Sequence, residues 1–165
     1  MKIYTRKGDA GKTDVIGGRV NKDDPVIECL GAIDELAVAV MTASHYQDDE
    51  ALKEDLHELA NEFFALSAAV MGKTEALGDE SVSRLEARID LYQEKIKPLT
   101  GFVLPGETLP GSYLHAARVA ARRLERRIVA YAREASITAA VLSYVNRLSD
   151  LLFVMARYAE ENYVQ

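Results

Sequence analysis

The stretch ALKEDLHELANEFFALSAAVMG, residues 51–72, carries the pattern that decides the fold. Its apolar residues recur every three or four positions, as expected for one face of a helix with 3.6 residues per turn. Gly72 is a residue type that commonly follows a helix end. The pattern predicts a helix over residues 49–71 that buries one face, which consists of Leu52, Leu56, Leu59, Phe63, Leu66 and Val70.

Four further segments predict helices of the same kind. Asp24 is a suitable N-cap and Pro25 a suitable first helical residue, whereas Pro98 should end the third helix. The first 24 residues contain four glycines and no strand pattern, which predicts a glycine-rich loop. The fold class is therefore all-α: one domain with a five-helix bundle over residues 25–162 behind an N-terminal loop over residues 1–24. The other expected helices cover residues 25–46, 81–97, 111–134 and 137–162.

Composition excludes several classes of protein. A length of 165 residues fits one domain, and a net charge of −6 gives no general affinity for nucleic acid or anionic membranes. The single cysteine, Cys29, has no intramolecular disulfide partner and is expected to be a small buried hydrophobe. The N-terminus has no secretory pattern, and no apolar run approaches the ~18 residues of a membrane span. We expect a cytoplasmic protein.

The first predicted helix places a carboxylate, Asp34, on an apolar face. At about 100° per residue, this face also carries Ile27, Leu30, Ala37, Val38 and Met41. Asp34 either lies at the edge of the face and reaches water, or forms a buried or interfacial pair, most naturally with arginine. Both interpretations remain open at this point.

The segment ARVAARRLERR, residues 117–127, offers arginines for such a pair. Arg118, Arg122 and Arg126 recur every four residues beside the apolar face, and Glu125 projects between the first two and could orient one of them. Planar guanidinium groups in a row suit a polyphosphate. The alternative is an ordinary solvated basic face with internal Glu–Arg support.

The segment TRKGDAGKTD, residues 5–14, has the chemistry of a phosphate loop without the Walker A spacing. Its glycines let backbone N–H groups approach a ligand, and Asp9 or Asp14 could help to hold a hydrated magnesium ion. A mobile N-terminal arm is the alternative. The side chains that could contact phosphate are Thr5, Arg6, Lys7, Lys12, Thr13 and Lys22.

In this order, the motifs resemble the PduO-type ATP:cob(I)alamin adenosyltransferases over nearly the whole chain. Further matching pieces are KDD at 22–24, GAIDEL at 31–36, FVLPG at 102–106 and VNRLSDLLFVMAR at 145–157. The resemblance implies a single cobalamin adenosyltransferase-like domain that transfers the 5′-deoxyadenosyl group of ATP to the cobalt of a reduced corrinoid, cob(I)alamin, and releases triphosphate. It also implies Mg²⁺, a homotrimer with active sites between subunits, a corrinoid reductase, and an adenosylcobalamin-dependent client enzyme.

The same resemblance assigns roles to residues. Asp34 pairs with Arg118 across the subunit boundary, and Phe102 packs against the lower face of the corrinoid, where it keeps the lower axial ligand off cobalt. No metal ligand is assigned, and the chain departs from the family pattern at Lys7 and Glu107. The residues implied in ATP binding are Thr5, Arg6, Lys7, Gly8, Thr13, Asp14, Lys22, Arg122, Glu125, Arg126 and Asn146.

Two rival functions are open to test. Glu54 and His57 form one Glu-x-x-His, but a ferritin-type metal site needs two such motifs and two further glutamates facing inward. The second rival is a non-catalytic, ATP-binding regulatory bundle derived from the same fold. As an isolated aromatic residue, Phe102 could also be a core anchor. The three histidines, His45, His57 and His115, form no evident catalytic constellation.

Overall fold

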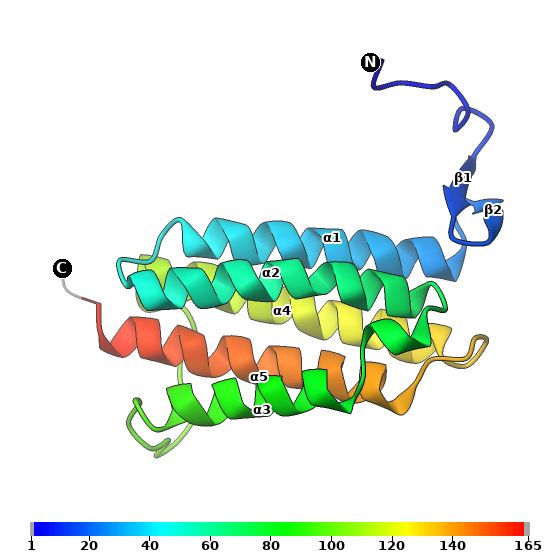
Figure 1. Ribbon diagram of the computed structural model, residues 1–165. Helices are drawn as coiled ribbons and strands as arrows, with labels where there is room; N and C mark the ends of the chain where they lie inside the picture. The colour runs from blue at the N-terminus through cyan, green and yellow to red at the C-terminus, as the bar shows by residue number, and fades with distance from the viewer. Residues whose placement is uncertain (1, 164–165) are drawn as a thin grey trace.

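The computed structural model describes residues 2–163 and confirms the expected bundle of five long helices (Figure 1). A short 3₁₀ helix, η1, precedes the third of them, and a small β-hairpin precedes the first. The elements are β1 (Lys12–Val15), β2 (Gly18–Asn21), α1 (Pro25–Ser44), α2 (Glu50–Val70), η1 (Thr74–Ala76), α3 (Asp79–Gln93), α4 (Leu109–Tyr131) and α5 (Ala139–Glu161).

The hairpin corrects the expectation that residues 1–24 contain no strand. Strands β1 and β2 are antiparallel, with Lys12 opposite Asn21 and Val15 opposite Gly18. The two-residue connection ends on Gly17, whose φ of 93° is a conformation that favours glycine. With only four residues in each strand, the alternation of side chains is too short to stand out from a glycine-rich loop.

Most helix ends differ from the expected ones by one to four residues, and two of the differences are instructive. Helix α4 starts at Leu109 because Thr108 caps it: its Oγ1 accepts a hydrogen bond from the backbone N–H of Gly111 at 3.1 Å. Helix α3 ends at Gln93 and is followed by turns, so the chain has left the helix before Pro98. Capping is a local signal that the periodicity of apolar residues does not report.

The core lies where α4 packs between α1 and α5, with α2 against α1 and α3 against α5 (Figure 1). By length and composition, α5 could cross a membrane, but more than half of its apolar window is buried within the bundle, as in the core helix of a globular protein. Cys29 is buried as expected, and burial raises the pKa of its thiol to about 11. Leucines from four of the helices fill the centre: Leu36, Leu56, Leu66, Leu124 and Leu148.

Helix α3 is tied to the bundle by a polar cluster at its inner face. Arg88 of α3 lies 3.2 Å from the carboxylate of Glu62 on α2, and the same carboxylate accepts a hydrogen bond from the Tyr144 hydroxyl at 2.6 Å. Arg88 also lies 3.6 Å from Asp55. These partners compensate the partial burial of the charges. The cluster fixes α3 beside α2 and α5.

Candidate active site

Helix α4 carries two sets of arginines that differ in their partners. Arg123 forms an ion pair with Glu35 of α1, and Arg127 lies 3.0 Å from the carboxylate of Glu28. The Glu35 side chain remains half exposed in this pair. The other three arginines, which we call the open row, have no carboxylate within ion-pair distance among residues 2–163. The open row consists of Arg118, Arg122 and Arg126.

Members of the open row are held by neutral groups. The Nε of half-buried Arg118 donates a hydrogen bond to Nδ1 of His115 at 3.1 Å, and Nη1 of Arg126 donates to the backbone oxygen of Arg122, also at 3.1 Å. Burial, followed by the charge of Arg122, lowers the pKa of Arg118. The row is therefore a concentration of positive charge that its own chain does not neutralise.

An open groove of about 700 Å³ runs along this side of α4. It joins two members of the open row, Arg118 and Arg126, to the loop between α3 and α4, which contains the FVLPG motif. Helix α4 supplies most of the wall, and the loop closes one end. The groove is lined by Pro105, Gly106, Ser112, His115, Ala116, Arg118, Val119, Ala120, Arg123 and Arg126.

Phe102 lies in that loop with its side chain fully exposed. The possibility that it anchors the core is therefore wrong. Leu104 and Leu99 are also exposed, so the loop presents several apolar side chains to its surroundings. Such a loop can pack against an apolar ligand or against another chain.

Glu125 and Asn146 contact each other. The amide Nδ2 of Asn146 on α5 donates a hydrogen bond to Oε1 of Glu125 on α4 at 2.9 Å. The oxygen of the same amide accepts a hydrogen bond from Arg147 at 2.8 Å. The expectation that Glu125 orients Arg118 or Arg122 is corrected here, because α5 lies against α4 and brings Asn146 to this carboxylate. The contact does join two of the residues predicted to bind ATP.

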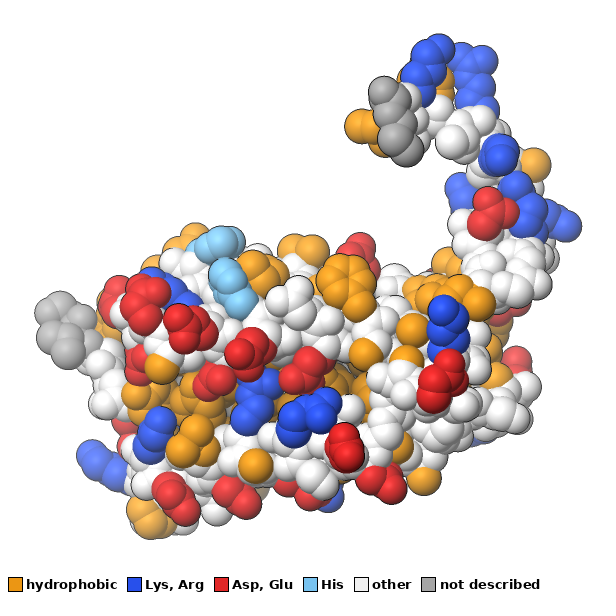
Figure 2. All heavy atoms as spheres, viewed as in Figure 1, with side chains coloured by type: hydrophobic (Ala, Val, Ile, Leu, Met, Phe, Trp, Pro, Cys, Tyr) orange, Lys and Arg blue, Asp and Glu red, His pale blue; other side chains and the backbone are white. Residues whose placement is uncertain are grey.

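The N-terminal residues form an arm with a defined conformation, which projects from the bundle and carries a group of basic side chains (Figure 2). Nη2 of Arg19 donates to the backbone oxygens of Lys7 and Lys12, at 2.7 and 3.3 Å, and closes the loop between them. Lys22 lies over Gly8, where an added Cβ would lie 3.2 Å from the lysine Nζ. Arg6 has a φ of 60°, an unusual value for a residue with a side chain.

The predicted ATP-binding residues therefore fall into two groups within one chain. The first group is on the arm, and the second is on α4 and α5. No hydrogen bond or ion pair within residues 2–163 joins residues 2–22 to α4, and the arm points away from the bundle (Figure 1). The arm group is Thr5, Arg6, Lys7, Gly8, Thr13, Asp14 and Lys22, and the helical group is Arg122, Glu125, Arg126 and Asn146.

Asp34 is exposed on α1, and its carboxylate has no ion-pair partner among the described residues. The apolar face on which it was placed exists, but that face is not the core face of the helix. Val38 is 61% exposed and Met41 is half-buried, while the core face consists of Val26, Cys29, Ile33, Leu36, Val40 and Ala43. The expected pair with Arg118 across a subunit boundary stays a prediction.

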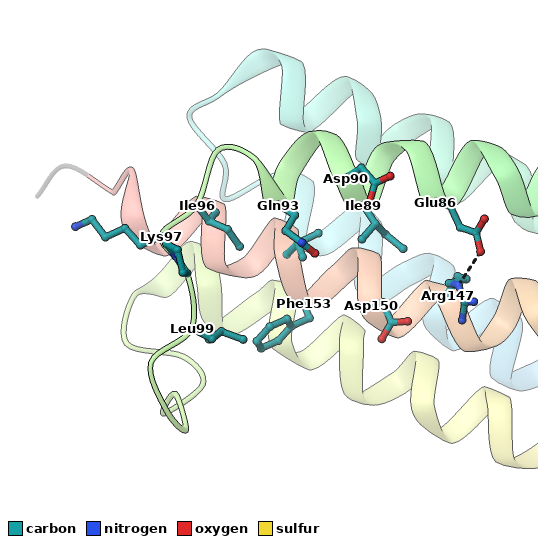
Figure 3. A pocket seen from close by; sticks show the side chains of 12 residues that line it. Glu86, Ile89, Asp90, Gln93, Ile96, Lys97, Leu99, Arg147, Asp150 and Phe153 are labelled. Atoms are coloured by element: carbon teal, nitrogen blue, oxygen red, sulfur yellow. Dashed lines mark hydrogen bonds and ion pairs between the residues drawn. The ribbon is translucent and has the colours of Figure 1, made fainter.

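A larger groove, of about 800 Å³, lies between α3, α5 and the segment that follows α3 (Figure 3). Its floor includes Ile89 and Phe153, and an ion pair between Arg147 and Glu86, at 3.0 Å, lies at one end. None of the predicted site residues lines it. The Glu54–His57 pair of the ferritin-type alternative is exposed on α2, whereas such a site needs both side chains to face inward.

Three contributors to the site were missed by sequence reasoning. They are His115, which lines the groove, Glu160, which contacts His115 and the loop, and Arg19 on the arm. His115 had a local signal, since it precedes Arg118 by three residues on the same helix face. Glu160 and Arg19 act on residues distant in sequence, and no spacing rule connects them to their partners.

The geometry defines a class: a helical-bundle protein with an arginine-bearing helix that suits a polyanion, beside a loop that exposes apolar side chains. The family model described as "Cobalamin adenosyltransferase" matches residues 3–159, so the chain belongs to the cobalamin adenosyltransferase family and is a transferase of that class. The resemblance found in the sequence is thereby confirmed.

Individual relatives agree with this placement. The corrinoid adenosyltransferase of Bacillus subtilis is 41% identical, over 95% of this chain and 86% of its own length. The corrinoid adenosyltransferase PduO of Salmonella typhimurium is 39% identical over 95% of this chain, which spans about half (49%) of that protein. A variant PduO-type ATP:corrinoid adenosyltransferase from Lactobacillus reuteri, complexed with cobalamin and ATP, has a TM-score of 0.88 at 34% identity, over 97% of this chain and 94% of that one.

Proposed function

We propose that the chain transfers the 5′-deoxyadenosyl group of ATP to the cobalt of a reduced corrinoid. The cobalt(I) centre of the substrate attacks C5′, the bond between C5′ and oxygen breaks, and triphosphate leaves with the electron pair. The observation that carries the proposal is the open row, which has no carboxylate partner among residues 2–163 and of which Arg118 and Arg126 line a groove that ends at the loop bearing Phe102. Relatives that act on corrinoids support it, and they favour an enzyme over a regulatory bundle that only binds ATP.

The open row acts on the leaving group. Negative charge develops on the triphosphate as the bond to C5′ lengthens, and Arg122 and Arg126 would stabilise it with permanently charged guanidinium groups. The nucleophile is a metal centre that carries its own electron pair, so the transfer needs no general base. Asn146 and Glu125, already hydrogen-bonded to each other, would contact the nucleoside part of ATP.

The loop between α3 and α4 would hold the corrinoid on the side opposite to ATP. Phe102 would pack against the lower face of the macrocycle and keep the lower axial ligand away from cobalt. Removing that ligand makes reduction of cobalt(II) to the nucleophilic cobalt(I) easier. A side chain that is fully exposed in the isolated chain is free for this contact.

A second copy of the chain would complete the site. The arm carries phosphate-binding residues but makes no polar contact with α4 of its own chain, so the arm of a neighbouring subunit is proposed to cover the open row. The exposed apolar face around Asp34 would pack in the same boundary and bring that carboxylate to Arg118. The proposed assembly is a cytoplasmic homotrimer, supplied by a corrinoid reductase and serving an adenosylcobalamin-dependent client enzyme.

Magnesium would enter with the nucleotide. Residues 2–163 contain no group of three or more His, Cys, Asp or Glu side chains placed to hold a metal ion, so they do not fit an ion caged by protein alone. A hydrated Mg²⁺ held mainly by phosphate oxygens needs only one or two carboxylates. Asp9 and Asp14 are exposed on the arm and could contact its waters, although Asp14 also lies 3.5 Å from Arg19.

Anaerobic incubation with ATP and chemically reduced cobalamin tests the function directly. The expected result is loss of the cob(I)alamin absorption and appearance of a product whose cobalt–carbon bond is broken by light. One triphosphate should form for each adenosylated corrinoid. Binding of ATP without any light-sensitive product would support the regulatory alternative instead.

A further inference from the structure

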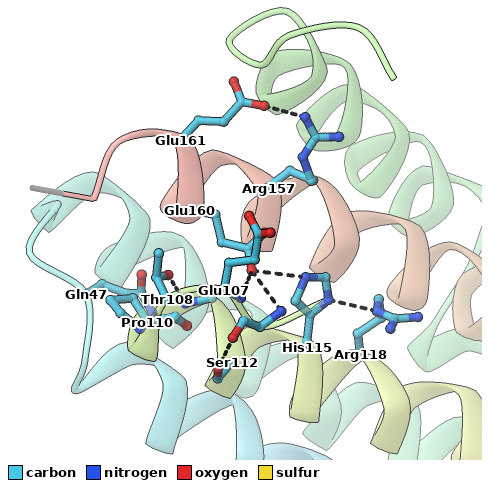
Figure 4. A network of polar contacts seen from close by, with 12 residues as sticks. Gln47, Glu107, Thr108, Pro110, Ser112, His115, Arg118, Arg157, Glu160 and Glu161 are labelled. Atoms are coloured by element: carbon cyan, nitrogen blue, oxygen red, sulfur yellow. Dashed lines mark hydrogen bonds and ion pairs between the residues drawn. The ribbon is translucent and has the colours of Figure 1, made fainter. Parts of the chain in front are cut away.

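Glu160, near the end of α5, is a buried carboxylate that holds the loop bearing Phe102 (Figure 4). Its side chain is 7% exposed. Oε1 accepts hydrogen bonds from the backbone N–H groups of Gly106 and Glu107, at 3.0 and 3.2 Å. Two charge-assisted hydrogen bonds to consecutive backbone groups fix the end of the FVLPG segment relative to α5.

His115 lies between this carboxylate and the open row. Its Nε2 is 3.5 Å from the same Oε1 of Glu160, and its Nδ1 accepts the hydrogen bond from Nε of Arg118. Because Nδ1 is an acceptor, the ring proton of the neutral imidazole is on Nε2 and faces the carboxylate. The imidazole therefore lies between the two groups: Nδ1 is hydrogen-bonded to Arg118, and Nε2 faces Glu160 at a distance at which it makes no hydrogen bond.

The surroundings leave the Glu160 carboxylate little room to move. Gly111 of α4 packs against it so closely that an added Cβ would lie 2.6 Å from Oε1. On the other side, Ser112 donates a hydrogen bond to the backbone oxygen of Gly106 at 3.0 Å. The chain segment over residues 106–115 and the end of α5 thus meet at this single side chain.

We propose that Glu160 and His115 are positioning residues that set the loop bearing Phe102 and the guanidinium of Arg118 in register for the corrinoid. This inference rests on the proposed function, because Phe102 is assigned there to the corrinoid and Arg118 to the subunit boundary at which the site is completed. Neither positioning residue touches substrate. Glu160 fixes the position of the loop relative to α5. His115, which lies between Glu160 and Arg118, relates the position of Arg118 to that of the loop.

The two nitrogens of His115 can be tested separately. Asparagine places its amide oxygen near the position of Nδ1, so His115→Asn keeps an acceptor for Arg118 and loses the contact with Glu160. Glutamine reaches the position of Nε2, so His115→Gln keeps a donor for Glu160 and loses the acceptor. We expect His115→Gln to raise KM for cobalamin about tenfold, as is typical when a supporting hydrogen bond is lost. KM for ATP should change less than twofold, and His115→Asn, which keeps the acceptor for Arg118 but loses the connection to Glu160, should raise KM for cobalamin by a smaller factor.

The hydrogen bonds by which Glu160 holds the loop, which we call the clamp, can be tested by hydrogen exchange, without measuring turnover. In the unaltered chain, the amide protons of Gly106 and Glu107 should be protected from hydrogen exchange. Glu160→Gln keeps an oxygen acceptor and should retain much of the protection, whereas Glu160→Ala should lose at least tenfold of it. Exchange at these two amides that is unchanged in Glu160→Ala overturns the clamp. If Glu160→Ala does not fold, the His115 pair still tests the connection to Arg118.

The matched control is His57→Gln, which changes an exposed histidine on α2 outside the groove. It should match the unaltered chain in both KM values. Equal cobalamin KM values in His115→Gln, His115→Asn and the control would refute the positioning role while leaving the proposed function intact. If the unaltered chain forms no adenosylated corrinoid, the proposed function fails, and the exchange data then describe only a loop clamp.

Discussion

Two sets of arginines on the same helix have opposite surroundings. Arg123 and Arg127 face α1, where Glu35 and Glu28 neutralise them. The open row lies a quarter turn or more away around the helix, and its described partners are an imidazole and a backbone oxygen. Residue type and helix are the same, so the difference comes entirely from what the neighbouring helix supplies.

The contrast separates a structural use of arginine from a ligand-binding one. A paired arginine joins two helices and contributes modestly to stability, since its charge is already compensated. An uncompensated row of like charges is unfavourable in the free chain, because Arg118 and Arg122 repel each other. Such an arrangement is useful where a polyanion is to be bound, and the following changes test that reading, from the largest expected effect to the smallest.

Replacement of Arg122 should have the largest effect. Arg122→Ala removes a permanent charge from the developing triphosphate, and the loss of one such donor is expected to lower kcat by about 10²- to 10³-fold. The melting temperature should change little, because the Arg122 side chain is exposed. Steady-state kinetics with varied ATP, beside thermal unfolding, provide the measurement. Unaltered kinetics would remove Arg122 from the site.

Replacement of Asp34 should have the second-largest effect. Asp34→Asn keeps the shape of the side chain but removes the charge proposed to reach Arg118 from a neighbouring subunit. Truncating one member of a desolvated charge pair costs about 2 kcal/mol or more, so assembly or corrinoid affinity should weaken by about 30-fold. Sedimentation across a range of protein concentrations and KM for cobalamin would report the two effects. A variant with normal assembly and normal KM would leave Arg118 without its proposed partner.

A fall in pH should lower the stability of the folded chain through His115, the neutral partner of Arg118. Burial lowers the pKa of His115, with a smaller contribution from the charge of Arg118, while Glu160 opposes the shift. The unfolded chain therefore takes up this proton first as the pH falls. The contribution of His115 to stability is complete above its ordinary pKa of about 6.5 and is lost as the pH falls towards the lower pKa of the folded state.

Thermal unfolding between pH 7 and pH 5 measures this dependence. The melting temperature of the unaltered chain should fall over this interval, and the fall should be smaller in His115→Asn, which has no group that titrates there. An equal fall in both proteins would mean that the pH dependence comes from other groups.

The sequence predicted one set of arginines better than the other. Regular spacing placed Arg118, Arg122 and Arg126 together, and the apolar periodicity predicted all five long helices, because both depend on the helical repeat alone. The partners of Arg123 and Arg127 depend on which face of α1 meets α4, and one sequence does not fix that. The role of Glu160 was invisible for the same reason, since its hydrogen bonds span more than 50 residues. The hairpin was missed because four-residue strands give almost no periodic signal.

Replacement of Arg127, which is paired with Glu28, should have the smallest effect, and it serves as the control for Arg122→Ala. Arg127→Ala removes the 3.0 Å contact with the Glu28 carboxylate and a 3.1 Å hydrogen bond to the Glu28 backbone oxygen. Both side chains of this pair are partly exposed, so the loss should be about 0.5–1 kcal/mol, or about 1–3 °C in melting temperature. The kinetics with ATP and cobalamin should stay within about twofold, because this arginine is compensated within its own chain and lies outside the groove. A loss of activity as large as that of Arg122→Ala would show that α4 uses both sets on the substrate, and the distinction between the two sets would then have to be abandoned.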